Sequence, residues 1–235
     1  MKRPSPLPLA CAFVLFAAQA TATNLVVPGT ANIFGAGHAT APAPGGGGGG
    51  TLPPSLSFTA AAGQVMTVSG VGGSVSCCNS SMTGPDGGPY ASGTTDITGC
   101  GGLSGIRDGQ HTMFLVGVFL DAAEPADPAP PTLDFSAGQL GENFLVLAPQ
   151  VGQLFYVGDG LTGTGSGATQ SFLVPPTATR LFLGFADALE FGDPVSAPGF
   201  YEDNLGQLTA IVDVVPPVVV AARAGTWGRL KIAYR

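Results

Sequence analysis

The chain has 235 residues, of which 45% are hydrophobic and only 10% are charged, with 37 glycines and 21 prolines. The apolar content is sufficient for a hydrophobic core and argues against wholesale disorder, while glycine and proline interrupt every stretch that could form a long helix. Between Thr23 and Val215 the only bases are Arg107 and Arg180, against all 15 acids of the chain, and such a surface repels phosphate and excludes nucleic-acid binding.

Residues 1–22 are predicted to form a signal peptide. Lys2 and Arg3 precede an apolar run at 9–18, and the small residues of Ala18-Gln19-Ala20 and Ala20-Thr21-Ala22 offer cleavage sites. The run is too short to cross a bilayer as a permanent helix. We therefore expect a secreted, extracellular or cell-surface protein without a transmembrane span in its mature chain.

Residues 23–215 are predicted to form one β-domain of about eight or nine short strands separated by Gly- and Pro-rich turns. The first is NLVVPGTANIFGAGH at 24–38, which is predicted to form a strand or a strand pair. SLSFT and QVMTVSGVGGSV follow on either side of a hairpin-like break at Ala62-Gly63. The remaining strand-like runs, in chain order, are HTMFLVGVFL, ENFLVLA, QLFYVG, TQSFLVP, TRLFLGFAD and GQLTAIVDVV. This pattern predicts an all-β fold, a two-sheet antiparallel β-sandwich of the jelly-roll kind, with no substantial helix outside the signal peptide. A closed barrel is the alternative.

Two segments are expected to lie outside the packed strands. Residues 39–54 contain six glycines at 45–50 with prolines on both sides, and they are predicted to form a flexible surface loop that cannot pack. Residues 216–235 contain Arg223, Arg229, Lys231 and Arg235 without any acid, and they are predicted to form a basic, disordered C-terminal tail.

Three cysteines remain after signal cleavage: Cys77, Cys78 and Cys100. In an oxidising compartment we expect a disulfide from Cys77 or Cys78 to Cys100, with one thiol left over. The adjacent pair does not match the spaced cysteines of a zinc site.

Catalytic signatures are weak in this sequence. No G-x-S-x-G is present, and His38 and His111, which are the only histidines, are interpreted as structural or solvent-facing. GDGLTG at 158–163 is followed by residues that cannot begin a helix, so it is interpreted as a glycine-rich loop. The carboxylates of Glu190 and Asp193 are close in sequence, but their spacing alone defines no reaction. We expect a protein that is not an enzyme.

Five acids fall in the range from Asp187 to Asp203, and the last two of them lie in the segment GFYEDNLGQL, at 199–208. Calcium binds six to eight oxygen atoms from carboxylates, amide carbonyls and backbone carbonyls. Asp203 and Asn204 offer adjacent oxygens, and Asp187 ends a predicted core strand on the same rim. The sequence therefore predicts a calcium site.

The segments AGQVMTVSGVGGSVS, GPDG and LFLGFAD…GFYEDNLGQLTAIVDV resemble the PA-I-type calcium-dependent galactose lectins of bacteria. The resemblance implies a galactose-binding-like β-sandwich with calcium at one end, a domain that exported proteins with C-terminal sorting anchors share. It also implies a role for each matching residue. Asp187 is the strand-end acid, Phe200 gives a backbone carbonyl, Asp203 and Asn204 replace an Asn pair, and Ser76 lies near a distant carbonyl position. Asp187 and Asp203 would also take part in ligand binding.

Two functions follow as expectations. The first is an exported calcium-dependent carbohydrate-binding, lectin-like module with a glycan as its partner. The second is a non-catalytic extracellular structural or matrix protein whose calcium site only stabilises loops. GPDGGPYASG, at 84–93, contains neither the His nor the Gln with which the lectins contact sugar, so the two readings stay open.

Overall fold

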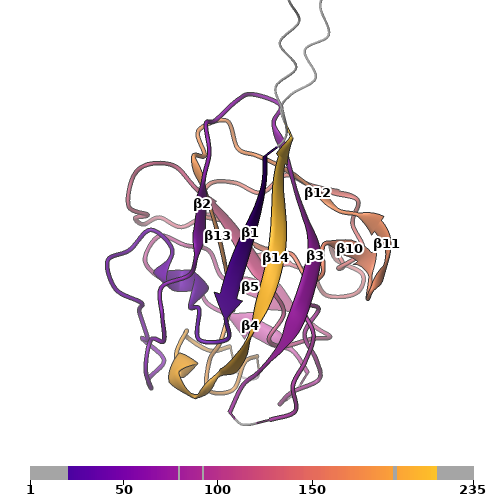
Figure 1. The fold of residues 1–235 in the computed structure, drawn as a ribbon. Helices are drawn as coiled ribbons and strands as arrows, with labels where there is room; N and C mark the ends of the chain where they lie inside the picture. Colours follow the sequence, from indigo (N-terminus) through magenta and orange to yellow (C-terminus); the bar gives the residue numbers. More distant parts are fainter. Residues whose placement is uncertain (1–20, 79, 92, 193–194, 216–235) are drawn as a thin grey trace, which may run out of the picture.

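The computed structural model describes residues 21–215, except for residues 79, 92 and 193–194 (Figure 1). Most of the predicted signal peptide and the predicted basic tail at 216–235 lie outside the described residues. Helical geometry in the described chain is limited to two short 3-10 turns, η1 at Ile33–Gly35 and η2 at Tyr201–Asp203. The predicted all-β class is confirmed, and no helix of this part of the chain has the length and apolarity to cross a membrane.

The largest sheet has five strands in the order β1-β14-β3-β12-β8. Their bounds are Thr21–Pro28 for β1, Leu205–Val215 for β14, Val65–Ser76 for β3, Ser171–Leu173 for β12 and Val146–Leu147 for β8. The alternating sequence of β14 buries Leu208, Ala210, Val212 and Val214 on one face, as expected of a strand with one face against a core. In Figure 1 the long strands β1, β14 and β3 lie side by side in front of β13.

A four-stranded sheet has the order β2-β13-β6-β9. Its strands are β2 at Ser55–Ser57, β13 at Arg180–Gly184, β6 at Val116–Leu120 and β9 at Leu154–Tyr156. All five residues of β6 and all three of β9 are buried, as the continuous apolar runs predict for strands covered on both faces.

Two small sheets complete the described fold. One contains β4 at Thr95–Ile97, β5 at Ile106–Asp108 and β7 at Leu133–Asp134, and the other is the hairpin of β10 at Leu161–Gly163 with β11 at Ser166–Thr169. Most strand pairs are antiparallel, but β12 with β8 and β5 with β7 are parallel. The glycines of GDGLTG therefore lead into a β-hairpin, in agreement with their interpretation as a loop.

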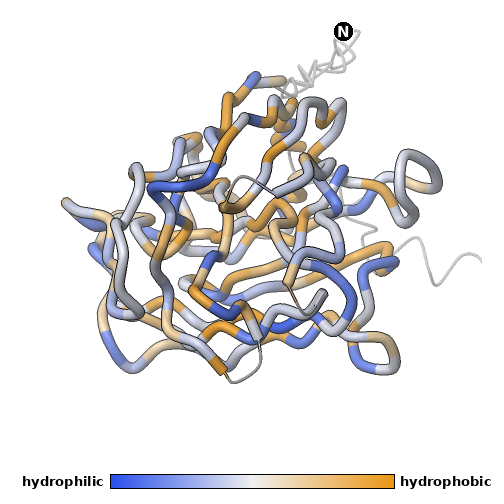
Figure 2. The backbone as a smooth tube through the Cα atoms, turned by 90° about the horizontal axis from the view of Figure 1, so that it is seen from below, coloured by the Kyte–Doolittle hydropathy of each residue, from blue (hydrophilic) through white to orange (hydrophobic). Residues whose placement is uncertain are grey.

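One hydrophobic cluster joins the two larger sheets. It includes Val27 of β1, Met66 of β3, Val118 of β6, Leu183 of β13 and Val212 of β14. In Figure 2 strongly hydrophobic stretches run through the middle of the molecule, and several of the most hydrophilic stretches lie in peripheral loops. The architecture is consistent with a β-sandwich.

The break at Ala62-Gly63 does not form a hairpin, contrary to the prediction. The strand before it, β2, pairs with β13, whereas the strand after it, β3, pairs with β14 and β12. The segment therefore crosses from one sheet to the other, and local turn signals cannot distinguish such a crossing from a hairpin.

The prediction that the six glycines at 45–50 cannot pack is wrong. The N–H of Gly45 donates to the carbonyl of Pro198 at 2.8 Å, and the carbonyls of Gly46 and Gly48 accept from Phe200 N–H at 3.1 Å and Tyr201 N–H at 3.0 Å. A Cβ on Gly45 would lie 2.3 Å from the carbonyl oxygen of Ala197. The glycines pack because they have no side chains, which lets two backbone segments approach closely.

We expect the exported chain to begin at Thr21, after cleavage behind Ala20. Thr21 pairs with Val214 and Ala22 pairs with Asp213, so cleavage behind Ala22 would remove two residues from the edge strand β1. N-terminal sequencing of the secreted chain measures the cut directly. A mature chain that starts at Thr23 would contradict this expectation.

Candidate cation site

Three strand ends bring the predicted calcium ligands to one end of the large sheet. Ser76 is the last residue of β3 and pairs with Leu205, the first residue of β14. Asn204 directly precedes that strand, and Asp203 ends the η2 turn before it. Asp187 follows β13 by three residues and meets the same segment.

Asp187 and Asn204 are in direct contact. The amide Nδ2 of Asn204 donates to Asp187 Oδ2 at 2.7 Å and to the carbonyl of Gly29, just after β1, at 3.1 Å. Both side chains are buried, with Asp187 fully shielded from solvent. The predicted convergence of these two residues is confirmed, although they are 17 positions apart in the chain.

Tyr201 connects the η2 turn, to which it belongs, with the segment that follows β13. Its hydroxyl accepts the backbone N–H of Asp187 at 2.9 Å and donates to the carbonyl of Phe185 at 3.2 Å. Its side chain is completely buried, so the η2 turn and the segment after β13 are held as one unit.

Four oxygen atoms at this place are buried without a hydrogen-bond partner. They are Ser76 Oγ, Asp187 Oδ1, Asp203 Oδ1 and Asn204 Oδ1. Leaving a buried polar atom unpaired costs about 1–3 kcal/mol, so four such atoms on neighbouring residues are unusual in a folded protein. All are oxygens that can accept but need not donate, which fits a hard cation such as calcium.

The local electrostatics disfavour the ionised form of Asp187. Burial raises the pKa of this carboxyl to about 8, and the negative charges of Asp203 and Glu202 add to the effect. The hydrogen bond from Asn204 acts in the opposite direction and is outweighed. A bound divalent cation would remove the penalty, because it supplies the positive charge that the site lacks.

Phe200 precedes η2 with φ of 67° and ψ of 23°, in the left-handed region that a non-glycine residue rarely adopts. This conformation turns the chain sharply into the Tyr201–Asp203 turn. The carbonyl of Phe200 as a ligand stays a prediction. Glu202 and Glu190 are exposed, and Asp193 lies outside the described residues.

The predicted disulfide to Cys100 is wrong. Cys77 pairs with its neighbour Cys78, and Cys100 is a free cysteine. The pair follows Ser76 directly, and its sulfur atoms lie within 4.8 Å of a carboxylate oxygen of Asp203. One thiol is left over, as expected, but the cross-link lies at the rim of the candidate cation site instead of closing a loop of moderate length.

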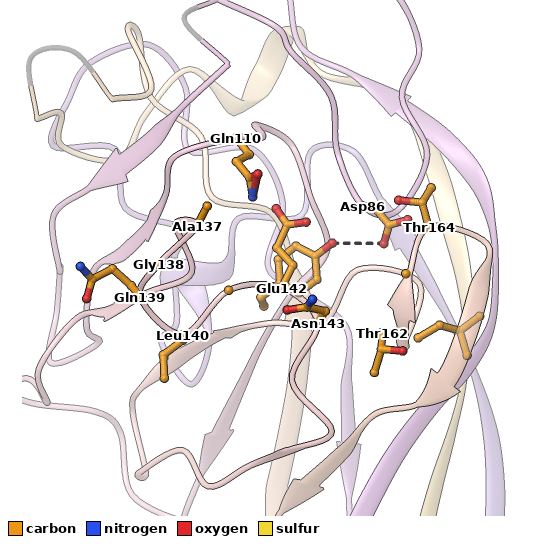
Figure 3. A pocket seen from close by; sticks show the side chains of 14 residues that line it. Asp86, Gln110, Ala137, Gly138, Gln139, Leu140, Glu142, Asn143, Thr162 and Thr164 are labelled. Atoms are coloured by element: carbon orange, nitrogen blue, oxygen red, sulfur yellow. Dashed lines mark hydrogen bonds between the residues drawn. The ribbon is translucent and has the colours of Figure 1, made fainter.

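A second cluster of titratable residues was not predicted. It contains Asp108 at the end of β5, His111, and Glu142, which lines a cavity of about 460 Å³. In the view of Figure 3, Glu142 lies between Gln139 and Asp86, and Asp86 accepts a hydrogen bond from Tyr156 at 3.2 Å. His111 Nδ1 is hydrogen-bonded to Glu142 Oε1. The D-x-x-H spacing at 108–111 was the available signal, but Glu142 comes from a distant loop.

Comparison with protein-family models, with curated proteins and with solved structures finds no match for this chain. The class that the fold defines is therefore that of an all-β protein with a cluster of unpaired buried oxygens at one end of its largest sheet.

Proposed function

We propose that this chain is an exported, non-enzymatic calcium-binding β-sandwich module. The observation that carries the proposal is the set of four unpaired buried oxygens on Ser76, Asp187, Asp203 and Asn204. With the carbonyl of Phe200 and one or two waters they would supply the six to seven ligands that calcium takes. Two carboxylates in this set match the charge of one divalent ion.

The ion would act first as a structural tie. Its ligands belong to the end of β3, the segment after β13 and the turn before β14, and the glycine run at 45–50 packs on the same turn. Binding to the folded state alone stabilises that state by mass action. Export is supported by the basic and apolar start of the sequence and by the Cys77–Cys78 disulfide, which fits an oxidising compartment.

Calcium-dependent carbohydrate binding is the second candidate, in line with the resemblance to the galactose lectins. It is favoured by Asp203, which is only partly buried and lies beside the exposed Cys78. A sugar hydroxyl could reach the ion from that side, whereas the side chains of Asp187 and Asn204 are closed to solvent. A glycan array read with calcium and again with chelator tests this role, and the absence of calcium-dependent binding would leave the structural role alone.

Calorimetry of the full chain tests the calcium site itself. We expect one calcium per chain and a higher melting temperature with calcium than with chelator. Asp203→Asn removes one charge and is expected to weaken binding at least ~10-fold, or ~1.4 kcal/mol. Asp213→Asn is the matched control, because it makes the same change on β14 at a residue that pairs with Ala22 and Thr67. Absence of binding heat together with an unchanged melting temperature would refute the proposal.

A further inference from the structure

Both histidines of the chain are paired with a glutamate, but their surroundings differ. His38 Nδ1 contacts Glu124 Oε1 at 2.9 Å and its Nε2 contacts the carbonyl of Gly101 at 2.9 Å, so both ring nitrogens have partners. Glu124 is largely exposed, with 66% of its side chain accessible. His111 and Glu142 form the second pair, in which only 20% of the glutamate side chain is accessible and a third acid lies close by.

That third acid, Asp108, is held in place by its own turn. Its Oδ1 accepts the backbone N–H of Gln110 at 2.7 Å and of His111 at 2.9 Å. Its Oδ2 is buried and has no hydrogen-bond partner, and only 1% of the residue is exposed. A carboxylate oxygen of Asp108 lies within 4.8 Å of one of Glu142. Burial raises the pKa of Asp108 to about 7, and the interaction with Glu142 adds to the effect.

We propose that Asp108, His111 and Glu142 bind a divalent transition-metal ion of the zinc class. One nitrogen and two carboxylate oxygens, all within 4.8 Å of one another, form the donor set. Imidazole favours zinc and its neighbours over calcium and magnesium, which prefer oxygen alone. Two carboxylates with a neutral imidazole balance the charge of one such ion.

Apart from His111 itself, the basic side chains of the described chain have their partners elsewhere. Arg107 lies 3.4 Å from Asp96 and 3.7 Å from Asp134, and Arg180 donates to the carbonyls of Asp121 and Ala123. Asp86 adds another negative charge near His111. The cluster therefore has an excess of acid that a cation would neutralise.

The geometry requires only a small rearrangement. Donor atoms around a tetrahedral zinc ion with bonds of ~2.1 Å lie ~3.4 Å apart. His111 Nδ1 and Glu142 Oε1 are closer than that, since they share a hydrogen, and the ion would take the place of this hydrogen. Three protein ligands leave one position for water or for an oxygen-bearing molecule in the cavity of about 460 Å³ that Glu142 lines (Figure 3).

The test is a titration of the full chain with zinc, without reductant and with excess calcium. The excess calcium is added to compete with zinc at the proposed site at Asp187, and the Asp203→Asn variant shows independently whether zinc binds there. We expect one zinc per chain, and at least a ~10-fold loss of affinity in both His111→Gln and Glu142→Gln. Three variants are expected to keep wild-type affinity: His38→Gln, which removes the other His–Glu pair, Cys100→Ser, which removes the free thiol, and Asp203→Asn.

Equal zinc affinity in the wild type and in Glu142→Gln would overturn the proposal. A loss of zinc affinity in His38→Gln or Cys100→Ser as large as that expected for His111→Gln would also overturn it. Glu142→Gln preserves shape, so it decides the matter if His111→Gln fails to fold. The visible spectrum of bound cobalt is a second measurement, since the wild type and His111→Gln should differ in it. The inference does not depend on the calcium proposal, because Asp203→Asn separates the two sites.

Discussion

Raising the pH from about 5 to about 8 is expected to destabilise the calcium-free protein, because Asp187 ionises readily in the unfolded chain but resists ionisation inside the fold. Its pKa is about 8 in the folded chain, compared with an ordinary value of 3.8. Between these two values the folded state keeps a proton that the unfolded state has released. The free energy of unfolding should therefore fall by about 1 kcal/mol per pH unit from this group, and level off above pH 8.

Urea unfolding in chelator at several pH values measures this slope. Asp108 acts in the same direction, because its pKa is also raised, so the informative quantity is the difference between the wild type and Asp187→Asn. The variant should show the shallower slope, since its amide does not titrate. Saturating calcium should flatten the wild-type slope, because the ion stabilises the carboxylate. Parallel curves for the wild type and Asp187→Asn would contradict the prediction.

The second large effect is expected from Gly50→Ala. Gly50 has a φ of +66°, and an added Cβ would lie 2.3 Å from the carbonyl oxygen of Thr30 and 2.5 Å from Cβ of Tyr201. Left-handed strain of ~1–2 kcal/mol and overpacking of ~1–3 kcal/mol together give a loss of about 3 kcal/mol in unfolding free energy. Calcium affinity should fall as well, because Tyr201 holds the segment of Asp187.

Gly165→Ala is the matched control for this substitution. Gly165 has the same φ of +66°, but an added Cβ would meet no atom within 4 Å. It should therefore show the strain alone, about 1–2 kcal/mol, with unchanged calcium affinity. Denaturant unfolding of both variants separates the two contributions. Equal losses would mean that close packing of the glycine run contributes nothing to stability.

The strands that could be predicted are those with a sequence pattern of their own. The alternation in LGQLTAIVDVV and the apolar runs containing VGVFL and RLFLG led to β14, β6 and β13. The small sheet of β4, β5 and β7 was missed, because its strands of two or three residues lie among Gly, Ser and Thr and are too short to show a period. The parallel pairing of β5 with β7 depends on contacts between distant segments.

The residues of the candidate cation site could be predicted without any periodic pattern. Asp203 and Asn204 are adjacent, and Asp187 ends a recognisable strand, so local order and a family resemblance were enough to bring them together. The packing of the glycine run against residues 197–202 could not be predicted, because composition gives the freedom of a glycine but not its neighbours. The role of Glu142 could not be predicted either, because it contacts His111 from 31 positions away in the sequence.

The pairing of β1 with β14 has a consequence for how the module would be displayed. β1 runs from Thr21 towards Gly29, whose carbonyl touches Asn204, while β14 runs back from Leu205 to Val215. Both ends of the described chain therefore emerge at one pole, and the candidate cation site lies at the other, roughly 34 Å away along the ten residue steps of β14. A neighbouring domain or an immobilising tag joined directly to either described end would therefore begin at the pole opposite the candidate cation site.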